Sequence, residues 1–330
     1  MSTATIAIAG LTGKFAQCIA KSLLAESNVS IRGYCRDVNK LPRAVLDSPR
    51  FEIIQGEFDN HELVRKFVHG SDIVICCYFG GADLMITGQK VLIDACDEEN
   101  VPRYVAGDFA VDFTKIPDGA PFPKQSTKIM MEYLKSKKVD GVHILVGVLM
   151  ETFWSPYFGL YNAQSRRLSH WGAGNDIWEF TTFQTAASYT AAIALDPEAV
   201  GVFRFLADRK SPVEIQEAFN RIYGQTLNLS SLGTLNVLEE RVHAAAKAHP
   251  DDLSTWGASG FTLWCINGKA YLGDLDNAKY PRIKPVDLET IFSRSRIRSS
   301  APGRSSTWTL IWEILPSRHL HIVSGFEEGS

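Results

Sequence analysis

One stretch near the start of the chain limits its possible folds more than any other. Residues 6–9 form an apolar run with no charge and no clean alternation, which is typical of a strand buried on both faces of a parallel sheet. A glycine-rich turn at residues 10–13 follows it directly. After the turn, apolar residues recur at helical spacing and predict one buried stripe, formed by Phe15, Ile19, Leu23 and Leu24.

A strand, a glycine turn and a helix in this order predict a binding site for a dinucleotide diphosphate. Glycines let backbone N–H groups approach the phosphates, and the helix N-terminus adds the positive end of its dipole. The flanking strand and helix distinguish this turn from a chance match, although an ordinary strand-to-helix turn is the alternative. We expect the cofactor to contact Gly10, Thr12, Gly13, Lys14 and Phe15.

The residue after the second predicted strand, residues 29–34, indicates which dinucleotide binds. An acidic residue there would bond the ribose 2′-hydroxyl of NAD, whereas an arginine accommodates the 2′-phosphate of NADP. Arg36 stands at this place, with Lys40 one helical turn beyond it and Asp37 as a competing carboxylate. Because a guanidinium matches phosphate geometry, we expect NADP(H), with Arg36 and Lys40 at the 2′-phosphate. The alternative is a solvated loop arginine.

Strand and helix patterns continue to alternate along the chain. Strands are predicted at 51–56, 71–78, 101–106 and 140–149, and helices at 60–68 and 84–99. This alternation predicts an α/β fold with a Rossmann-type doubly wound parallel sheet. Phe58 is a candidate wall for the adenine, and Phe79 precedes two glycines that would let a loop pass close beneath the cofactor.

Three segments together resemble one known family. They are Gly10-x-Thr-Gly-x-x-Ala16, Arg36 after the second strand, and residues 103–109 on the fifth. They resemble the NmrA-like and isoflavone-reductase-like group of atypical short-chain dehydrogenases/reductases, with the fungal NmrA-like branch the most similar. The resemblance extends to about Phe292. The chain departs from the family where Gly107-Asp108 replaces the usual Ser-Glu or Ser-Asp pair.

A helix predicted at 126–135 carries the candidate catalytic residue. Ser126 or Thr127 would cap it, and Lys128 then lies in the first turn, where the helix dipole disfavours a cation. The resemblance implies a role for Lys128, because reductases of the family carry a matching lysine that binds the nicotinamide ribose or polarises a carbonyl. A surface lysine is the alternative, and Lys124 is the nearest rival.

Aromatic residues cluster after the sixth predicted strand, at Phe153, Trp154, Tyr157 and Phe158. They predict a substrate pocket for a flat or apolar molecule, because such pockets are mostly apolar. Packing between two lobes is an equally good interpretation. His143, within the strand itself, is expected to be a hydrogen-bonded core residue rather than a catalytic one.

Composition sets the broader limits. The 330 residues suit a nucleotide-binding domain at 1–150, a smaller α+β substrate lobe at 151–293, and an atypical, flexible and basic tail at 294–330. In the second part we expect a hairpin over 171–182 and helices at 186–195, 212–223 and 236–248, the second capped by Ser211. A net charge of −3 gives no reason to bind nucleic acid, and no apolar run reaches the length of a membrane span. The six scattered cysteines predict no metal site and a reduced, cytoplasmic chain.

Two functions fit these features. The first is an NADPH-dependent reductase of a small aromatic or conjugated carbonyl or enone from secondary metabolism. The second is an NADP-binding redox sensor that acts by protein contact without catalysis, as the resemblance to regulatory family members implies. The partners expected are a small-molecule substrate and either a second copy of the chain, in a homodimer, or a regulatory protein.

Overall fold

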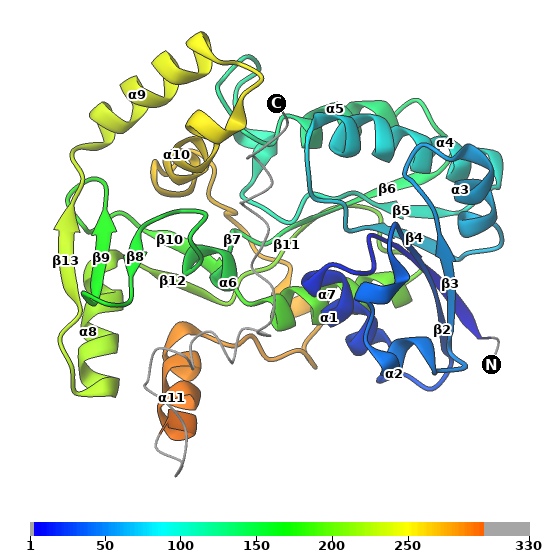
Figure 1. Cartoon of the computed structure of the whole chain (residues 1–330), viewed down its shortest axis with the longest axis horizontal. Coiled ribbons are helices and arrows are strands. Elements are labelled where there is room, and N and C mark those ends of the chain that lie inside the picture. The colour runs from blue at the N-terminus through cyan, green and yellow to red at the C-terminus, as the bar shows by residue number, and fades with distance from the viewer. Residues whose placement is uncertain (1–2, 300–330) are drawn as a thin grey trace.

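The computed structural model describes residues 3–299, and its largest element is a seven-stranded parallel sheet (Figure 1). The strands lie in the order β11-β6-β5-β4-β1-β2-β3, and each neighbouring pair is parallel. The order reverses between β1 and β4, where sheets of this kind bind ligands at the carboxyl ends of their strands. The predicted Rossmann-type fold is confirmed. The strands of this sheet are β1 (Ala4–Ala9), β2 (Val29–Cys35), β3 (Phe51–Gln55), β4 (Ile73–Cys76), β5 (Arg103–Val105), β6 (Asp140–Leu145) and β11 (Gly201–Arg204).

Helices cover both faces of the sheet, which explains why the first strand has no polar alternation. In β1, Ile6 and Ile8 face one layer of helices while Ala7 and Ala9 face the other, and all four side chains are fully buried. The first layer is formed by α1 (Lys14–Leu23) and α7 (Phe183–Leu195). The second layer is formed by α3 (His61–Val68), α4 (Gln89–Glu98) and α5 (Ser126–Leu134). A π-helical segment, η2 (Asp83–Gly88), leads into α4.

The sheet does not end with the first 150 residues. Its edge strand β11 pairs with β6, and α7 packs against α1 on the face of the same sheet. Both elements come from residues beyond 150, so the sheet draws on residues from both sides of the predicted domain boundary. The chain leaves the sheet after β6, builds part of a second lobe, and returns to complete the sheet.

A buried arginine joins this returning segment to the sheet. Arg103, on β5, is 5% exposed, and its guanidinium donates to the carbonyl oxygens of Ile193 at 3.0 Å, Ala194 at 2.9 Å and Asp196 at 2.6 Å. These carbonyls lie at the C-terminal end of α7, where a helix carries partial negative charge. Arg103 therefore caps α7 and fixes it against the sheet.

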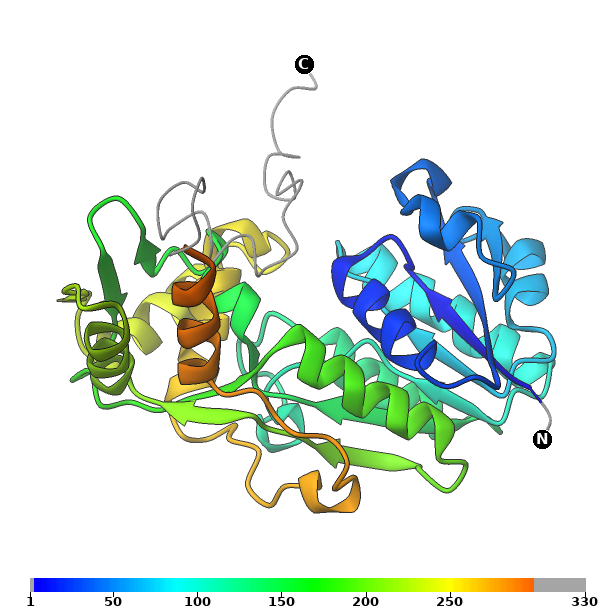
Figure 2. The ribbon, with the colours of Figure 1, turned by 90° about the horizontal axis from the view of Figure 1, so that it is seen from below.

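The second lobe grows from the carboxyl ends of β6 and β11 and lies beside the nucleotide-binding half (Figure 2). It holds two three-stranded sheets, β12-β10-β7 and β13-β9-β8. Its strands are β7 (Val148–Leu149), β8 (Tyr161–Asn162), β9 (Arg167–His170), β10 (Trp178–Thr181), β12 (Asp208–Lys210) and β13 (Asn228–Ser231). Its helices are α6 (Met150–Phe153), α8 (Pro212–Tyr223), α9 (Leu235–Ala248), α10 (Leu253–Ile266) and α11 (Leu288–Ser299). Short helices elsewhere are η1 (Val38–Lys40), α2 (Arg43–Leu46), η3 (Phe113–Lys115) and η4 (Asn277–Lys279).

Several sequence expectations fail in this half. No hairpin forms over 171–182 among the described residues, because β10 pairs with β12 and β7, whereas β9 pairs with β13 and β8. The boundary predicted at residue 294 lies inside α11, which continues to Ser299. The rest of the predicted tail, residues 300–330, lies outside the described residues.

Helix caps were predicted with mixed success. Ser211 caps α8 as expected, in a capping box with Glu214. Ser126 and Thr127 do not cap α5, because the helix begins one residue earlier than that role requires and its N-cap is Gln125. Both residues are instead buried within the first turn, where the Thr127 hydroxyl donates to the Lys124 carbonyl at 2.8 Å.

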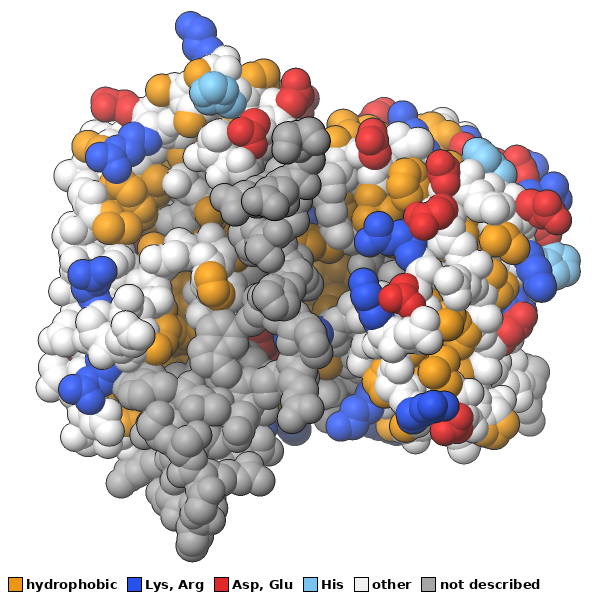
Figure 3. All heavy atoms as spheres, viewed as in Figure 1, with side chains coloured by type: hydrophobic (Ala, Val, Ile, Leu, Met, Phe, Trp, Pro, Cys, Tyr) orange, Lys and Arg blue, Asp and Glu red, His pale blue; other side chains and the backbone are white. Residues whose placement is uncertain are grey.

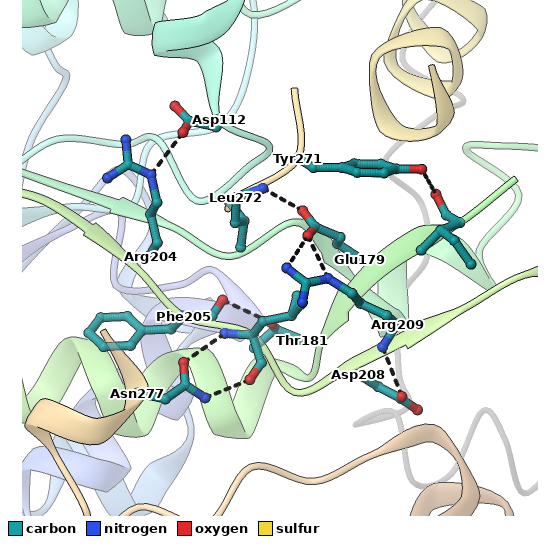
Figure 4. Close-up of polar contacts among 12 residues, drawn as sticks. Asp112, Glu179, Thr181, Arg204, Phe205, Asp208, Arg209, Tyr271, Leu272 and Asn277 are labelled. Carbon is teal, nitrogen blue, oxygen red and sulfur yellow. Dashed lines mark hydrogen bonds and ion pairs between the residues drawn. The ribbon is translucent and has the colours of Figure 1, made fainter. Parts of the chain in front are cut away.

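Polar side chains tie the segment between α10 and α11 to the two lobes (Figure 4). The Asn277 side chain accepts from the backbone N–H of Leu206 at 3.1 Å and donates to its carbonyl at 2.7 Å. Glu179, which is 3% exposed, accepts from Arg209 at 2.9 Å and from the Leu272 backbone N–H at 2.7 Å. These contacts fasten the segment between α10 and α11 to β10 and to the residues that follow β11.

The surface carries no dominant charge on the face drawn in Figure 3, where positive and negative side chains are interspersed over the nucleotide-binding half. Among residues 3–299, no helix is both long and apolar enough to cross a membrane. Within the same residues, no three His, Cys, Asp or Glu side chains are grouped so that they could hold a metal ion.

Candidate cofactor and active site

The turn after β1 is fixed by close backbone packing. Gly10 has a φ of +80°, and a Cβ added there would lie 2.9 Å from the Cys77 carbonyl oxygen. The backbone N–H groups of Gly10 and Leu11 donate to the Tyr34 carbonyl at 2.9 and 3.2 Å. A side chain at Gly10 would therefore be strained and would also clash with the loop after β4. The turn lies at the point where the strand order reverses.

The first turn of α1 fits a diphosphate. Gly13 is the N-cap, and no side chain caps this helix end. An added Cβ at Gly13 would lie 3.3 Å from the Gly10 carbonyl, so the turn also requires a small residue there. The backbone N–H groups at the start of α1, and the positive end of its dipole, thus suit an anion that lies close to the backbone. Thr12 and Lys14 border the same turn.

Arg36 and Lys40 follow β2 and are exposed. Neither side chain makes a hydrogen bond or ion pair with any other described residue, so both are available to a ligand. Asp37, the competing carboxylate, is instead used locally, since it accepts from the Asn39 backbone N–H at 3.0 Å and from its side chain at 3.1 Å. The charge at this strand end is therefore arranged for a phosphate rather than for a hydroxyl.

The two aromatic residues proposed for the adenosine end, Phe58 and Phe79, differ in their exposure to solvent. Phe58 is partly buried, and its ring lies so close to the π-helical segment that a Cβ at Gly88 would be 3.1 Å away. Phe79, after β4, is 73% exposed. Tyr78 is instead the aromatic residue beside the turn, since its Cδ1 lies 3.4 Å from a Cβ added at Gly10.

The two candidate lysines point to different places. The Lys128 ammonium donates to the Ile116 carbonyl and to Asp118 at 2.8 Å, and that carboxylate is almost fully exposed. The Lys124 ammonium donates to the carbonyl of Asp108, the third residue after β5 ends. Of the two, Lys124 is thus the one held at the carboxyl ends of the strands. The sequence favoured Lys128 because it lies in the first turn of the predicted helix and because the family resemblance implies a matching lysine.

Burial shapes the chemistry of Lys124. It lowers the pKa of the ammonium to about 8, and the Asp108 carboxylate and the Cys76 thiol act in the opposite direction. Cys76 ends β4, which pairs with β5. Lys124, Asp108 and Cys76 therefore lie together at the carboxyl ends of these two strands. An ammonium with a pKa near neutrality is suited to give a proton to a substrate.

A buried, hydrogen-bonded Asp–His pair lies beside this lysine. Asp108 Oδ2 lies 2.6 Å from Nδ1 of His143 on β6, and their side chains are 1% and 5% exposed. His143 is thus the hydrogen-bonded core residue that the sequence predicted. Its partner was missed, although Asp108 stands in the segment that carries the family resemblance, because the two residues are separated by 35 positions.

Three aromatic rings pack together beside the glycine turn. They come from the first turn of α1, the segment after β5, and the first residue of α7. Phe15 lies 4.7 Å from Phe109 and 5.6 Å from Phe183, measured between ring centroids. Phe109 has a φ of +36°, which is unusual for a residue other than glycine. This strained backbone turns the ring toward Phe15, and the three rings form an apolar wall beside the glycine turn.

The aromatic segment after β7 divides into two parts. Phe153 and Trp154 are 1% and 4% exposed and belong to the core of the second lobe, where Phe153 packs on Trp178 at 4.9 Å and on Phe180 at 5.0 Å. Packing is therefore the role supported for these two residues. Tyr157 and Phe158 are only partly buried.

Glu151, in the first turn of α6, is a partly buried acid that the sequence did not reveal. Both of its oxygens accept from the Phe183 backbone N–H at 2.9 Å. Burial raises the pKa of this carboxyl group to about 7, against the opposing effect of backbone hydrogen bonds. Its charge also contributes to the raised pKa of Cys18 on α1, after burial of that thiol. Glu151 therefore joins α6 to the start of α7, and its charge acts on Cys18 of α1.

Comparison with known proteins agrees with this geometry. Residues 10–144 match the model of a family described as NAD(P)H-binding. A bifunctional pinoresinol-lariciresinol reductase from Linum usitatissimum is 20% identical over 260 residues, which cover 72% of this chain and 81% of the relative. An isoflavone reductase structure has a TM-score of 0.71 at 16% identity, and a leucoanthocyanidin reductase–NADPH complex from Vitis vinifera has 0.71 at 17%; each covers 89% of this chain and 99% of the solved one.

These findings define the class of the protein: it contains an NAD(P)H-binding domain of Rossmann type, built around residues 10–144. Its fold over most of the chain is that of the isoflavone-reductase-like proteins. The resemblance to the NmrA-like and isoflavone-reductase-like group of atypical short-chain dehydrogenases/reductases is thereby confirmed, while the fungal branch stays a prediction.

Proposed function

We propose that the protein is an NADPH-dependent reductase of a small aromatic or conjugated carbonyl or enone. The observation that carries this proposal is the Lys124 ammonium at the carboxyl ends of β4 and β5, in the same half as the phosphate-binding turn. A bound nicotinamide cofactor supplies the hydride. The chain has to bind and orient both molecules and provide the proton.

The glycine turn and α1 hold the diphosphate, and Arg36 with Lys40 binds the 2′-phosphate of the adenosine ribose. Arg36, which has no partner within residues 3–299, can form two parallel hydrogen bonds with a phosphate, which favours NADPH over NADH. Phe58 and Phe79 border the adenosine end in this proposal. Phe79 would lose its exposure there, which fits a large apolar side chain next to a ligand site.

Lys124 acts as the proton donor. With a pKa of about 8, the ammonium is mostly charged at neutral pH and can release its proton to a carbonyl oxygen as negative charge develops on it. Lys128, engaged by Ile116 and Asp118, is the competing candidate, and its contacts support a role in fixing the loop before α5. The two lysines provide a matched pair for testing.

The substrate class follows from the apolar wall. Phe15, Phe109 and Phe183 offer aromatic surface next to the turn, and Tyr157 and Phe158 offer more from the second lobe. Small-molecule sites combine such surface with a few polar groups, here an ammonium. Aromatic and conjugated substrates fit this combination.

The test is NADPH oxidation against a panel of aromatic aldehydes and enones, with Lys124→Met and Lys128→Met in parallel. Loss of a general acid should lower kcat about 100-fold or more in the Lys124 variant, and the Lys128 variant should stay within about 3-fold of the natural protein. Equal losses in both variants, or a loss confined to Lys128→Met, would transfer the role to Lys128.

A sensor without catalysis is the second candidate. It is favoured by Gly107, which removes the hydroxyl that the family resemblance implies near the nicotinamide. Saturable NADPH binding without turnover on any member of the panel would support the sensor, with a regulatory protein as its partner. A cytoplasmic location and a homodimer also stay predictions.

A further inference from the structure

The Asp108–His143 pair is almost fully buried, with side chains that are 1% and 5% exposed. Removing a carboxylate and an imidazole from water is costly unless each is paired, and here they satisfy one another across a 2.6 Å hydrogen bond. In other proteins, well-packed apolar residues often replace a buried charged pair without loss of stability. The pair therefore invites a functional explanation, and its position beside Lys124 supplies one.

The backbone at Asp108 is held in an unusual shape. Its N–H donates to the Ala106 carbonyl at 2.8 Å, and the next residue, Phe109, has the left-handed φ of +36°. The Phe109 N–H donates to Ile144 on β6 at 3.0 Å, one residue beyond His143. This arrangement turns the Asp108 carbonyl toward the Lys124 ammonium, which donates to it. Strain of this kind persists where the surroundings enforce it and is concentrated at functional sites.

Two titratable groups act on Lys124 from the elements packed against it. They are the Asp108 carboxylate after β5 and the Cys76 thiol at the end of β4. Burial favours the neutral amine, and the carboxylate opposes that effect because opposite charges attract strongly away from water. The 2.6 Å hydrogen bond between Asp108 Oδ2 and His143 Nδ1 fixes the position of this carboxylate.

We propose that Asp108, oriented by His143, is a positioning residue that holds the Lys124 ammonium at the sheet edge and keeps it charged. This inference rests on the proposed reductase function, because it assigns Lys124 the proton of that reaction. Asp108 fixes the ammonium through its backbone carbonyl and its charge through its side chain. His143 acts one step further away, by keeping the carboxylate in place.

The direct test measures the protonation of Lys124 without any substrate. Competitive acylation over a pH series, with Lys124 quantified by mass spectrometry, gives the midpoint pH of its ammonium. Asp108→Asn keeps the shape of the side chain but removes its charge, so the midpoint should move down by about one pH unit, a tenfold change in the charged fraction. His143→Leu should move it in the same direction by less, and His143→Asn, which can retain a donor near Nδ1, should stay close to the natural value.

A matched control comes from the same loop. Asp112 is also a fully buried carboxylate, but it accepts from Arg204 at 2.8 Å (Figure 4) and does not act on Lys124. Asp112→Asn should leave the Lys124 midpoint unchanged. An unchanged midpoint in both Asp108→Asn and His143→Leu would overturn the inference, as would an equal shift in Asp112→Asn. If Asp108→Asn does not fold, the two His143 variants decide. Equal Lys124 midpoints in His143→Leu and His143→Asn would then overturn the inference.

Kinetics separate this inference from the proposed function. The natural protein should show kcat/KM that falls as pH rises through the midpoint of Lys124, because the charged form donates the proton. In Asp108→Asn that fall should begin about one pH unit lower, a tenfold loss above the midpoint, whereas a merely structural defect lowers kcat/KM equally at all pH values. Absence of turnover in the natural protein would count against the reductase, while the acylation result would still decide the role of Asp108.

Discussion

Replacing Glu151 with glutamine should remove a large pH dependence of stability. Burial raises the pKa of this carboxyl from its ordinary 4.5 to about 7 in the folded chain. The folded state therefore holds the Glu151 proton more tightly than the unfolded state does. Its contribution to stability is complete below the unfolded pKa and is lost as pH rises through the folded value.

The size of the effect follows from the shift. One pKa unit corresponds to about 1.4 kcal/mol, so ionising Glu151 in the folded state costs about 3 kcal/mol above neutral pH. Glutamine stays neutral and keeps an oxygen to accept from the Phe183 N–H. Between pH 5 and pH 8, the free energy of unfolding of the natural protein should fall by about 2 to 3 kcal/mol relative to Glu151→Gln.

Urea unfolding of both proteins at pH 5 and pH 8 gives this difference, and effects common to both proteins cancel. The comparison isolates Glu151 because the remaining titratable groups are the same in each. Parallel pH dependence in the two proteins would refute the reasoning, since it would mean that the carboxyl group is not buried as described.

Three further substitutions test separate parts of the fold. Arg103→Met removes three hydrogen bonds to the end of α7 and should lower the free energy of unfolding by about 3 kcal/mol, measured in urea. Ser211→Ala removes a capping box and should cost about 1 kcal/mol in the same assay; no loss would argue against the cap. Gly10→Ala should weaken NADPH binding at least about tenfold in a fluorescence titration, because a side chain is strained at that φ and clashes with Cys77; unchanged affinity would contradict the close packing of the turn.

The sequence predicted the elements whose signals are local. The run ending at Ala9, the glycine turn and Ser211 each lie within a few residues of the features that reveal them. What it missed depends on contacts between distant residues. The partner of His143 is 35 positions away, and the return of β11 to the sheet follows from pairing with β6 rather than from its own pattern.

The choice between the two lysines shows the same limit at the site itself. Lys124 and Lys128 lie four positions apart, and the sequence favoured Lys128 because it alone stands in the predicted helix 126–135. The loop that leads into α5 brings the Lys124 ammonium to the Asp108 carbonyl, whereas the Lys128 ammonium contacts Asp118. No local pattern reveals which way such a loop runs.

The most direct test of the whole account is a titration of the natural protein and Arg36→Ala with NADPH and with NADH. The natural protein should bind NADPH saturably, and about 10-fold or more tightly than NADH, because a bidentate arginine–phosphate contact is worth at least about 1.4 kcal/mol. Arg36→Ala should lose that preference while retaining binding of NADH. Absence of saturable binding of either nucleotide to the natural protein would contradict the central claim that the turn at residues 10–13 holds a dinucleotide.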